Sequence, residues 1–208
     1  MIVNWSGLFE EFVTIWVVVD PIGTLPVFLA VTAGMEPRLR KRIAIKAIVT
    51  AAAILLFFLV CGQLLIEALG ISLLSFQISG GIILFLFALT MIFGSSKPQS
   101  EMKLGAAGDG DLAIFPLAVP SIAGPGAMLA VVLLTDNHRF SLVDQSLTSV
   151  VMLAVLALTL VLLLLANPIH RLIRESGASI VSRVMGMILA AVAADTVLEG
   201  LEMRFMQP

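Results

Sequence analysis

Charged residues are scarce in this chain. Asp, Glu, Lys and Arg together make up 12% of the 208 residues, whereas 60% are hydrophobic, and the mean hydropathy is +1.11. Soluble domains carry about 25% charged residues, so this composition excludes an ordinary soluble domain. The chain is therefore expected to be an integral membrane protein.

The residues that most often carry catalysis or bind metal are also rare. Cys61 is the only cysteine, which excludes a disulfide within the chain and a CxxC motif. His138 and His170 lie in or next to predicted loops on opposite sides, so we expect neither a metal site nor histidine-based catalysis. Residues 108–111 spell the GxGD pattern of intramembrane aspartyl proteases, but the chain has no tyrosine for the partner motif of those enzymes. We predict no enzymatic activity, no cofactor and no nucleic-acid partner.

Six apolar runs are each long enough to cross a bilayer as a helix. They cover residues 8–31, 43–68, 71–93, 112–134, 147–166 and 180–198. The length of the chain suits one bundle of six such helices with short connections. We therefore predict an all-α membrane protein with a single transmembrane bundle over residues 1–208.

The basic residues predict the orientation of this bundle. Ten of the twelve Lys and Arg lie in or beside the connections between the first and second, third and fourth, and fifth and sixth spans. Arg139 and Arg204 are the two on the other side. By the positive-inside rule the three basic connections are cytoplasmic, and both termini are predicted to face outward.

The chain has the pattern of an internal duplication. Pro21 and Pro125 are 104 residues apart, half the length of the chain, and residues 81–84 (Gly-Ile-Ile-Leu) match residues 186–189 (Gly-Met-Ile-Leu) at a spacing of 105. Three spans per half is an odd number, so the second half enters the membrane upside down. We predict two inverted-topology three-helix repeats, residues 1–94 and 112–208, joined by a cytoplasmic linker at 95–111. Chance similarity between Leu-, Ile- and Gly-rich helices is the alternative.

The first and fourth spans are predicted to be broken helices. Asp20 and Pro21 interrupt the first apolar run, and Gly124, Pro125 and Gly126 interrupt the fourth. Asp is a preferred N-cap and Pro a preferred first helical residue, so each break is expected to start a second half-helix near the bilayer centre. An acid at that depth requires a protein or water partner.

The two breaks together suit a small zwitterion. A half-helix N-terminus offers unpaired N–H groups and partial positive charge to a carboxylate, and unwound carbonyls upstream offer oxygen to an ammonium group or a cation. Glycines would let a ligand approach the backbone closely. The predicted substrate-binding residues are Asp20, Pro21, Gly23, Thr24, Ser121, Ala123, Gly124, Pro125 and Gly126.

Several of these residues have a structural alternative. Asp20 either carries a coupling proton or binds the substrate's amino group, or it merely caps its half-helix. Thr24 and Ser121 either contact a ligand or satisfy carbonyls freed beside a proline. Asp195, in the last span, is either part of an outward-facing polar pathway or an interfacial acid reaching water.

Four ordered motifs resemble those of the MarC family of bacterial and archaeal six-span membrane proteins. They lie at residues 20–28 (DPIGTLPVF), 78–84 (ISGGIIL), 116–127 (PLAVPSIAGPGA) and 183–186 (RVMG). The resemblance runs nearly end to end and implies a multi-pass protein of a prokaryotic cytoplasmic (inner) membrane. It also implies kinship with the SnatA-like neutral amino-acid transporters, whose activity is uptake of glycine, alanine and similar amino acids with protons.

The function predicted from the residues and the resemblance is secondary transport of small neutral amino acids. The substrate would be held between the two breaks, and Asp20 is the predicted proton-coupling residue. The alternatives are an exporter or channel for another small metabolite and, from a different class, an intramembrane enzyme. Membrane lipid is an expected partner, and a homo-oligomer is compatible with the sequence but not indicated by it.

Overall fold

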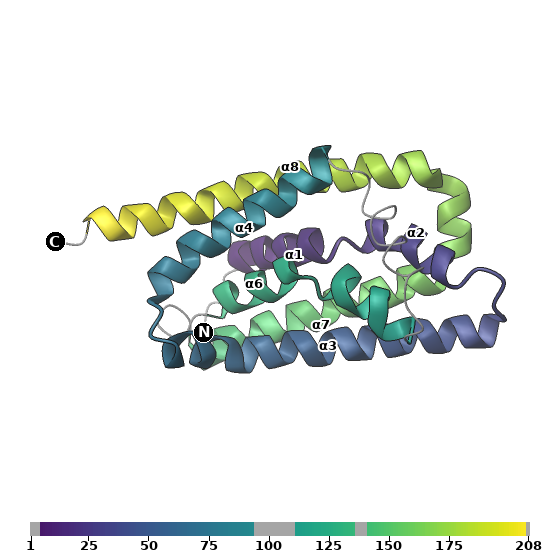
Figure 1. The fold of residues 1–208 in the computed structure, drawn as a ribbon, viewed down its shortest axis with the longest axis horizontal. Coiled ribbons are helices and arrows are strands. Elements are labelled where there is room, and N and C mark those ends of the chain that lie inside the picture. The colour runs from purple at the N-terminus through teal and green to yellow at the C-terminus, as the bar shows by residue number, and fades with distance from the viewer. Residues whose placement is uncertain (1–4, 94–110, 136–140, 207–208) are drawn as a thin grey trace.

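The computed structural model describes residues 5–93, 111–135 and 141–206, and within these ranges every regular element is a helix (Figure 1). The first half contributes α1 (Trp5–Val19), α2 (Pro21–Val31), α3 (Pro37–Ala68) and α4 (Leu73–Phe93). The second half contributes the irregular helical segment η1 (Ala113–Ile122), α6 (Pro125–Leu134), α7 (Leu142–Leu164) and α8 (Ala166–Met206).

The helices are long and apolar enough to form the predicted spans. Five stretches meet the length and hydropathy of a membrane crossing: Gly7–Val31, Pro37–Ala68, Leu74–Phe93, Leu142–Leu164 and Ser179–Phe205. A sixth crossing is formed if η1 and α6, which meet at an angle of 54°, are taken as one broken span. The prediction of an all-helical membrane protein is confirmed.

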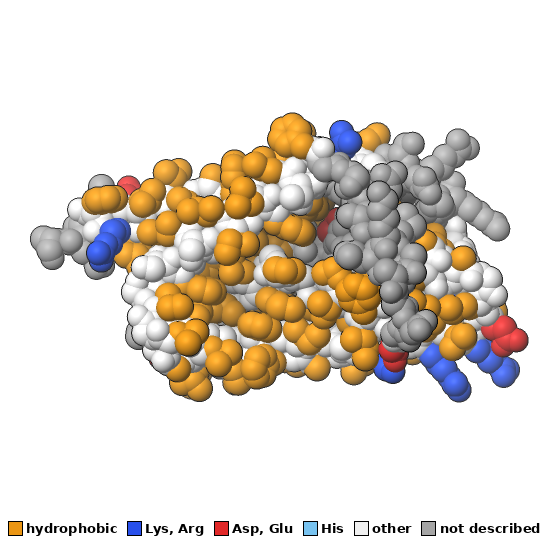
Figure 2. Space-filling model, in the orientation of Figure 1, with side chains coloured by type: hydrophobic (Ala, Val, Ile, Leu, Met, Phe, Trp, Pro, Cys, Tyr) orange, Lys and Arg blue, Asp and Glu red, His pale blue; other side chains and the backbone are white. Residues whose placement is uncertain are grey.

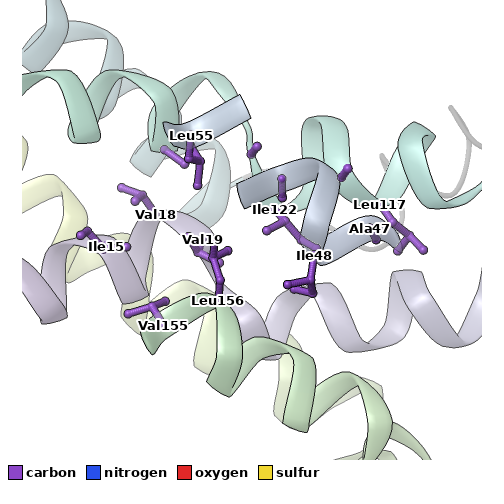
Figure 3. Packing of buried hydrophobic residues seen from close by; sticks show 14 of the residues in the cluster. Ile15, Val18, Val19, Ala47, Ile48, Leu55, Leu117, Ile122, Val155 and Leu156 are labelled. Carbon is purple, nitrogen blue, oxygen red and sulfur yellow. The ribbon is translucent and has the colours of Figure 1, made fainter. Parts of the chain in front are cut away.

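The broken helices occupy the middle of the molecule. In Figure 1, α3 and α7 lie along one side and α4 and α8 along the other, with α1, α2, η1 and α6 between them. Side chains from α1, α3, η1 and α7 meet in this interior, and Figure 3 shows Ile15, Val19, Leu55, Ile122 and Leu156 among them. All five are at most 1% exposed, so these parts of α1 and η1 are buried in the interior of the bundle.

The outer surface is apolar, as a bilayer requires. Large hydrophobic side chains such as Val60, Phe93 and Leu198 are 64% to 80% exposed, and Figure 2 shows hydrophobic groups along the length of the visible face. An apolar surface of this extent, on a chain whose helices are long enough to cross a bilayer, is the surface expected to contact membrane lipid. Lys and Arg gather mainly at the end of the molecule where α3 begins (Figure 2).

One predicted boundary and the form of one predicted connection differ from the structure. Helix α3 begins at Pro37 rather than near residue 43, so Arg38, Arg40, Lys41 and Arg42 lie in its first turns and not in a loop. The predicted connection between the fifth and sixth spans is also helical, because α8 extends from Ala166 to Met206, with a sharp bend near its start (Figure 1). Hydropathy detects where a segment becomes polar, but polar residues such as Arg and Lys are good helix formers and continue a helix beyond the membrane. Residues 95–110 of the predicted linker lie outside the described residues.

Candidate functional site

The two half-helices start near the middle of the bundle and run in opposite directions. Helix α2 runs from Pro21 toward the end where α3 begins, and α6 runs from Pro125 toward the end where α3 finishes (Figure 1). Each has proline in its first turn, where the missing N–H would have no intrahelical partner. The predicted pair of interrupted helices is therefore present.

The first break is a single residue, Asp20. Its backbone is in the left-handed region at φ 47° and ψ 66°, and it is the only described non-glycine residue with positive φ. Asp tolerates this conformation better than most residues because its short side chain can hydrogen-bond locally. The backbone N–H of Gly23 donates to Asp20 Oδ1 at 3.0 Å, so the side chain caps α2.

The second oxygen of the same carboxyl group contacts the other half of the chain. Ser182 Oγ, on α8, donates to Asp20 Oδ2 at 3.0 Å, and the two side chains are 3% and 1% exposed. The sequence prediction missed Ser182. A signal was available, because Ser182 lies one turn before Gly186 on the face of α8 that the internal repeat had singled out.

Two buried hydroxyl groups extend this cluster toward the second break. Ser121 Oγ, at the end of η1, donates to Thr24 Oγ1 at 3.2 Å, and Thr24 Oγ1 donates to the carbonyl oxygen of Asp20 at 3.0 Å. The same carbonyl oxygen also accepts from the Thr24 backbone N–H at 3.1 Å, so the hydroxyl groups of Thr24 and Ser121 are bonded within this group of residues. The hydrogen bonds of Asp20, Thr24, Ser121 and Ser182 join α2, η1 and α8, and we refer to these four residues as the Asp20 cluster.

Only glycine fits at position 23, because the carboxyl group of Asp20 occupies the space that a side chain would need. A Cβ atom at position 23 would lie 2.1 Å from Asp20 Oδ2 and 2.6 Å from Ser182 Oγ. Any larger residue would push the carboxyl group away from both of its donors. The glycine is thus required by the geometry of the cluster.

The predicted residues around the second break are placed differently. A Cβ atom on Gly124 would lie 2.6 Å from the carbonyl oxygen of Pro120, and one on Gly126 would lie 3.3 Å from the ring of Phe87 on α4. These two glycines are explained by close approach of backbone and of a neighbouring helix. Ala123 is buried beside Ser121, whereas Pro125 is exposed.

The first turn of α6 has no side-chain cap. Gly124 occupies the N-cap position in an extended conformation, and it has no side chain that could accept from the following N–H groups. The first turn of α2, by contrast, is capped by Asp20. The two half-helices therefore present chemically different N-termini.

The carboxyl group of Asp20 has no basic partner among the described residues. Its described contacts are the Gly23 N–H and the Ser182 hydroxyl group, and the one described ion pair, Lys46 with Asp111, lies elsewhere. A buried carboxylate without a countercharge is costly in a medium of low dielectric constant.

Asp195 lies in a separate polar cavity. The cavity has a volume of about 300 Å³, is formed between α1 and α8, and is lined by Glu10, Thr14, Asp195, Thr196 and Glu199 among others. Asp195 is exposed and is not part of the Asp20 cluster. The cavity lies toward the end of the molecule that holds both described chain ends (Figure 1).

Fold and surface define a multi-pass integral membrane protein with interrupted helices around a buried carboxyl group. Comparison with known proteins identifies the family. The model of the MarC family of integral membrane proteins matches residues 5–205. The chain therefore belongs to the MarC family.

Relatives in an archaeon and a bacterium cover nearly the whole chain. The chain is 34% identical over 200 residues to a UPF0056 membrane protein of Archaeoglobus fulgidus, covering 94% of this chain and 92% of the relative. It is also 34% identical over 200 residues to the UPF0056 inner membrane protein YhgN of Escherichia coli K12, covering 95% of this chain and 98% of the relative. No solved structure matches the chain.

Proposed function

We propose that this protein is a proton-coupled secondary transporter that moves small neutral amino acids, such as glycine and alanine, across the cytoplasmic membrane by alternating access. The observation that carries the proposal is the buried Asp20 carboxyl group, which lies without a basic partner among the described residues at a break between half-helices. The family resemblance supports the same substrate class.

The difference between the two half-helix N-termini gives each a separate role. Because Asp20 already caps α2, the N–H groups in the first turn of α6 are the ones left for a substrate carboxylate. The Asp20 carboxyl group would take the substrate's ammonium group. A zwitterion suits this arrangement because it carries both an ammonium group and a carboxylate.

A proton can take the place of the substrate's positive charge. When the ammonium group leaves, protonation of Asp20 removes the cost of a buried and uncompensated carboxylate. Exchange of proton and substrate on one carboxyl group would couple the two fluxes in opposite directions, because the carboxyl group would carry the substrate one way and the proton back. Ser182 would hold the carboxyl group in place in both states.

The proposed cycle requires movement, because the Asp20 cluster is closed in this conformation. Asp20, Thr24 and Ser121 are at most 1% exposed. A substrate can reach them only if one set of helices rocks against the other, as in transporters with broken helices. The hydrogen bonds from η1 and α8 to the first break are the contacts that such a movement would change.

Counterflow of radiolabelled glycine and alanine in proteoliposomes tests the proposal. Wild type is expected to exchange label, because counterflow needs only a substrate site that alternates between the two sides. Asp20→Asn keeps a short polar side chain that can cap α2 but loses the charge that would pair with the ammonium group, so it is expected to exchange label more slowly than wild type and not to accumulate substrate under an imposed pH gradient. If Asp20→Asn accumulated substrate to the wild-type level, Asp20 would only cap α2 and would not couple transport to protons.

The same assay separates the alternatives. A channel would give flux that neither saturates nor distinguishes L- from D-alanine, whereas a transporter gives saturable and stereoselective exchange. If correctly folded wild type exchanges no neutral amino acid, the substrate assignment is wrong.

A further inference from the structure

A second polar cavity lies at the end of the molecule where α3 begins. It has a volume of about 260 Å³ and is enclosed by the end of α2, the first turns of α3, the end of α7 and the start of α8. Its lining residues are Phe28, Pro37, Arg40, Lys41, Leu163, Leu164 and Asn167. Neither the Asp20 cluster nor the cavity at Asp195 shares a residue with it.

The charge of the described side chains that line this cavity is positive. Arg40 and Lys41 both line it, and among the described residues neither side chain has a carboxylate partner. The Arg40 guanidinium group is 5.6 Å from the ring centre of Phe28, and its two terminal nitrogens are each 3.4 Å from Asn167 Oδ1. These contacts fix the position of the guanidinium group and leave its charge unneutralised.

One apolar lining residue of the cavity is exposed on the outer surface. Leu163 is buried, but Leu164 is 46% exposed on the outer surface of α7, next to the basic groups. A ligand that placed an anionic group on Arg40 and Lys41 could therefore lay an acyl chain along Leu164. Basic pockets between membrane helices on the cytoplasmic side are suited to anionic lipid headgroups.

We propose that the cavity formed by Arg40, Lys41 and Asn167 binds the phosphate headgroup of an anionic phospholipid. Arg40 and Lys41 neutralise the phosphate, and the Asn167 amide contributes a hydrogen bond. The cavity is bounded by Phe28, near the end of α2, so the lipid contacts the half-helix that begins at Asp20. The proposal is independent of which substrate the protein carries.

Native mass spectrometry of the purified protein with phosphatidylglycerol or phosphatidylethanolamine tests this site. Wild type is expected to retain phosphatidylglycerol in preference to phosphatidylethanolamine. Arg40→Gln and Lys41→Gln should each weaken phosphatidylglycerol retention about fivefold, the effect expected for one basic side chain at an anionic headgroup. Lys41 is exposed, so its variant tests the site without disturbing the contact between Arg40 and Phe28.

Arg42→Gln is the matched control. Arg42 has the same charge on the same turn of α3 and is exposed, but it does not line the cavity. It is expected to retain phosphatidylglycerol like wild type. Equal losses in Arg42→Gln and Lys41→Gln would show general attraction to a basic surface and overturn the proposal.

A competition experiment distinguishes binding of a lipid headgroup from binding of a soluble anion. Inorganic phosphate and glycerol 3-phosphate carry the same charged group without acyl chains, and they are expected not to displace bound phosphatidylglycerol at concentrations that saturate simple phosphate sites. Displacement by inorganic phosphate would make the cavity a site for a soluble anion and overturn the lipid assignment. Equal retention of the two lipids by wild type would also overturn it.

Discussion

At the scale of single residues, the carboxyl group of Asp20 has two structural duties at once. One oxygen caps α2 through Gly23, and the other accepts from Ser182 on α8. A group that only capped a helix would need no partner from the other half of the chain. The contact with Ser182 instead ties the orientation of the carboxyl group to the position of α8.

Removing the Ser182 hydroxyl group is predicted to affect both stability and transport. Ser182→Ala leaves a buried carboxyl oxygen without its donor, which costs about 1–3 kcal/mol. The free energy of unfolding in detergent should fall by that amount. Amino-acid exchange in proteoliposomes should fall as well, because the carboxyl group is no longer held in one orientation.

Two comparisons make the Ser182 prediction specific. Ser146→Ala, at an exposed position of α7 whose hydroxyl group contacts only its own helix, should change neither quantity. In a double-mutant cycle, Ser182→Ala should cost less in an Asp20→Asn background, because the two side chains interact directly. Additive effects would contradict a direct role of the hydrogen bond.

The cluster also shows what could be predicted from the sequence. Asp20, Gly23, Thr24 and Ser121 were expected at the site from the breaks alone, since an acid, glycines and prolines are unusual in an apolar span. Ser182 was not, because a serine in a membrane helix is ordinary and only the fold brings α8 against α2. Gly124 and Gly126 were expected to leave room for a ligand, but the structure explains them by contacts with Pro120 and Phe87.

At the scale of helices, α4 and α8 pack through small residues. A Cβ atom on Gly81 would lie 2.6 Å from Val197 Cγ2 and 3.0 Å from the Ala193 carbonyl oxygen. A Cβ atom on Gly186 would lie 2.8 Å from Met91 Cβ and 3.1 Å from the Ala88 carbonyl oxygen. Close approach of this kind is a common basis for association between membrane helices.

Gly81→Ala and Gly186→Ala are each predicted to separate α4 from α8. Overpacking against backbone should lower the free energy of unfolding by about 1–3 kcal/mol in each variant. Ser79→Thr adds one methyl group at an exposed position of α4 and should leave stability unchanged. Thermal or denaturant unfolding in detergent measures all three, and a Gly81→Ala variant as stable as Ser79→Thr would contradict the packing.

The start of η1 is held to α3 by an ion pair between Lys46 and Asp111. The Lys46 ammonium group, with the Ala113 N–H, holds the pKa of Asp111 below its ordinary value of 3.8. Since the folded-state pKa is lowered, the pair stabilises the fold above pH 3.8, and the contribution is lost as the pH falls through the lowered pKa.

The pH dependence of this pair can be measured by comparing wild type with Asp111→Asn. At neutral pH the variant should unfold at a slightly lower temperature than wild type, because an exposed pair contributes little. Well below pH 3.8 the two proteins should unfold together. A difference that persisted or grew in acid would contradict the assigned pairing.

At the scale of the whole molecule, the contacts between α4 and α8 repeat themselves. Gly81 approaches Ala193, and Gly186 approaches Ala88, while residues 81 and 186, like residues 88 and 193, are 105 positions apart. A pseudo-twofold axis that relates the two halves of the chain would produce these two equivalent contacts, one from each half. The opposite directions of α2 and α6 fit the same axis (Figure 1), and the inverted repeat stays a prediction that these contacts support.

The orientation of the molecule in the membrane is predicted by the basic residues at the start of α3, which include Arg40 and Lys41 of the proposed lipid site. Arg42 lies near the start of α3, where basic residues gather, and Glu199 lies in α8 near the opposite end. By the positive-inside rule the first end is cytoplasmic and the second faces outward.

In a Cys61→Ser background, a membrane-impermeant maleimide should label Glu199→Cys in intact spheroplasts and Arg42→Cys only after the membrane is opened. Both positions are exposed, so a lack of labelling reports the side of the membrane and not burial. The reverse labelling pattern would show that the molecule has the opposite orientation. Labelling of both cysteines from one side would contradict an odd number of membrane crossings between positions 42 and 199.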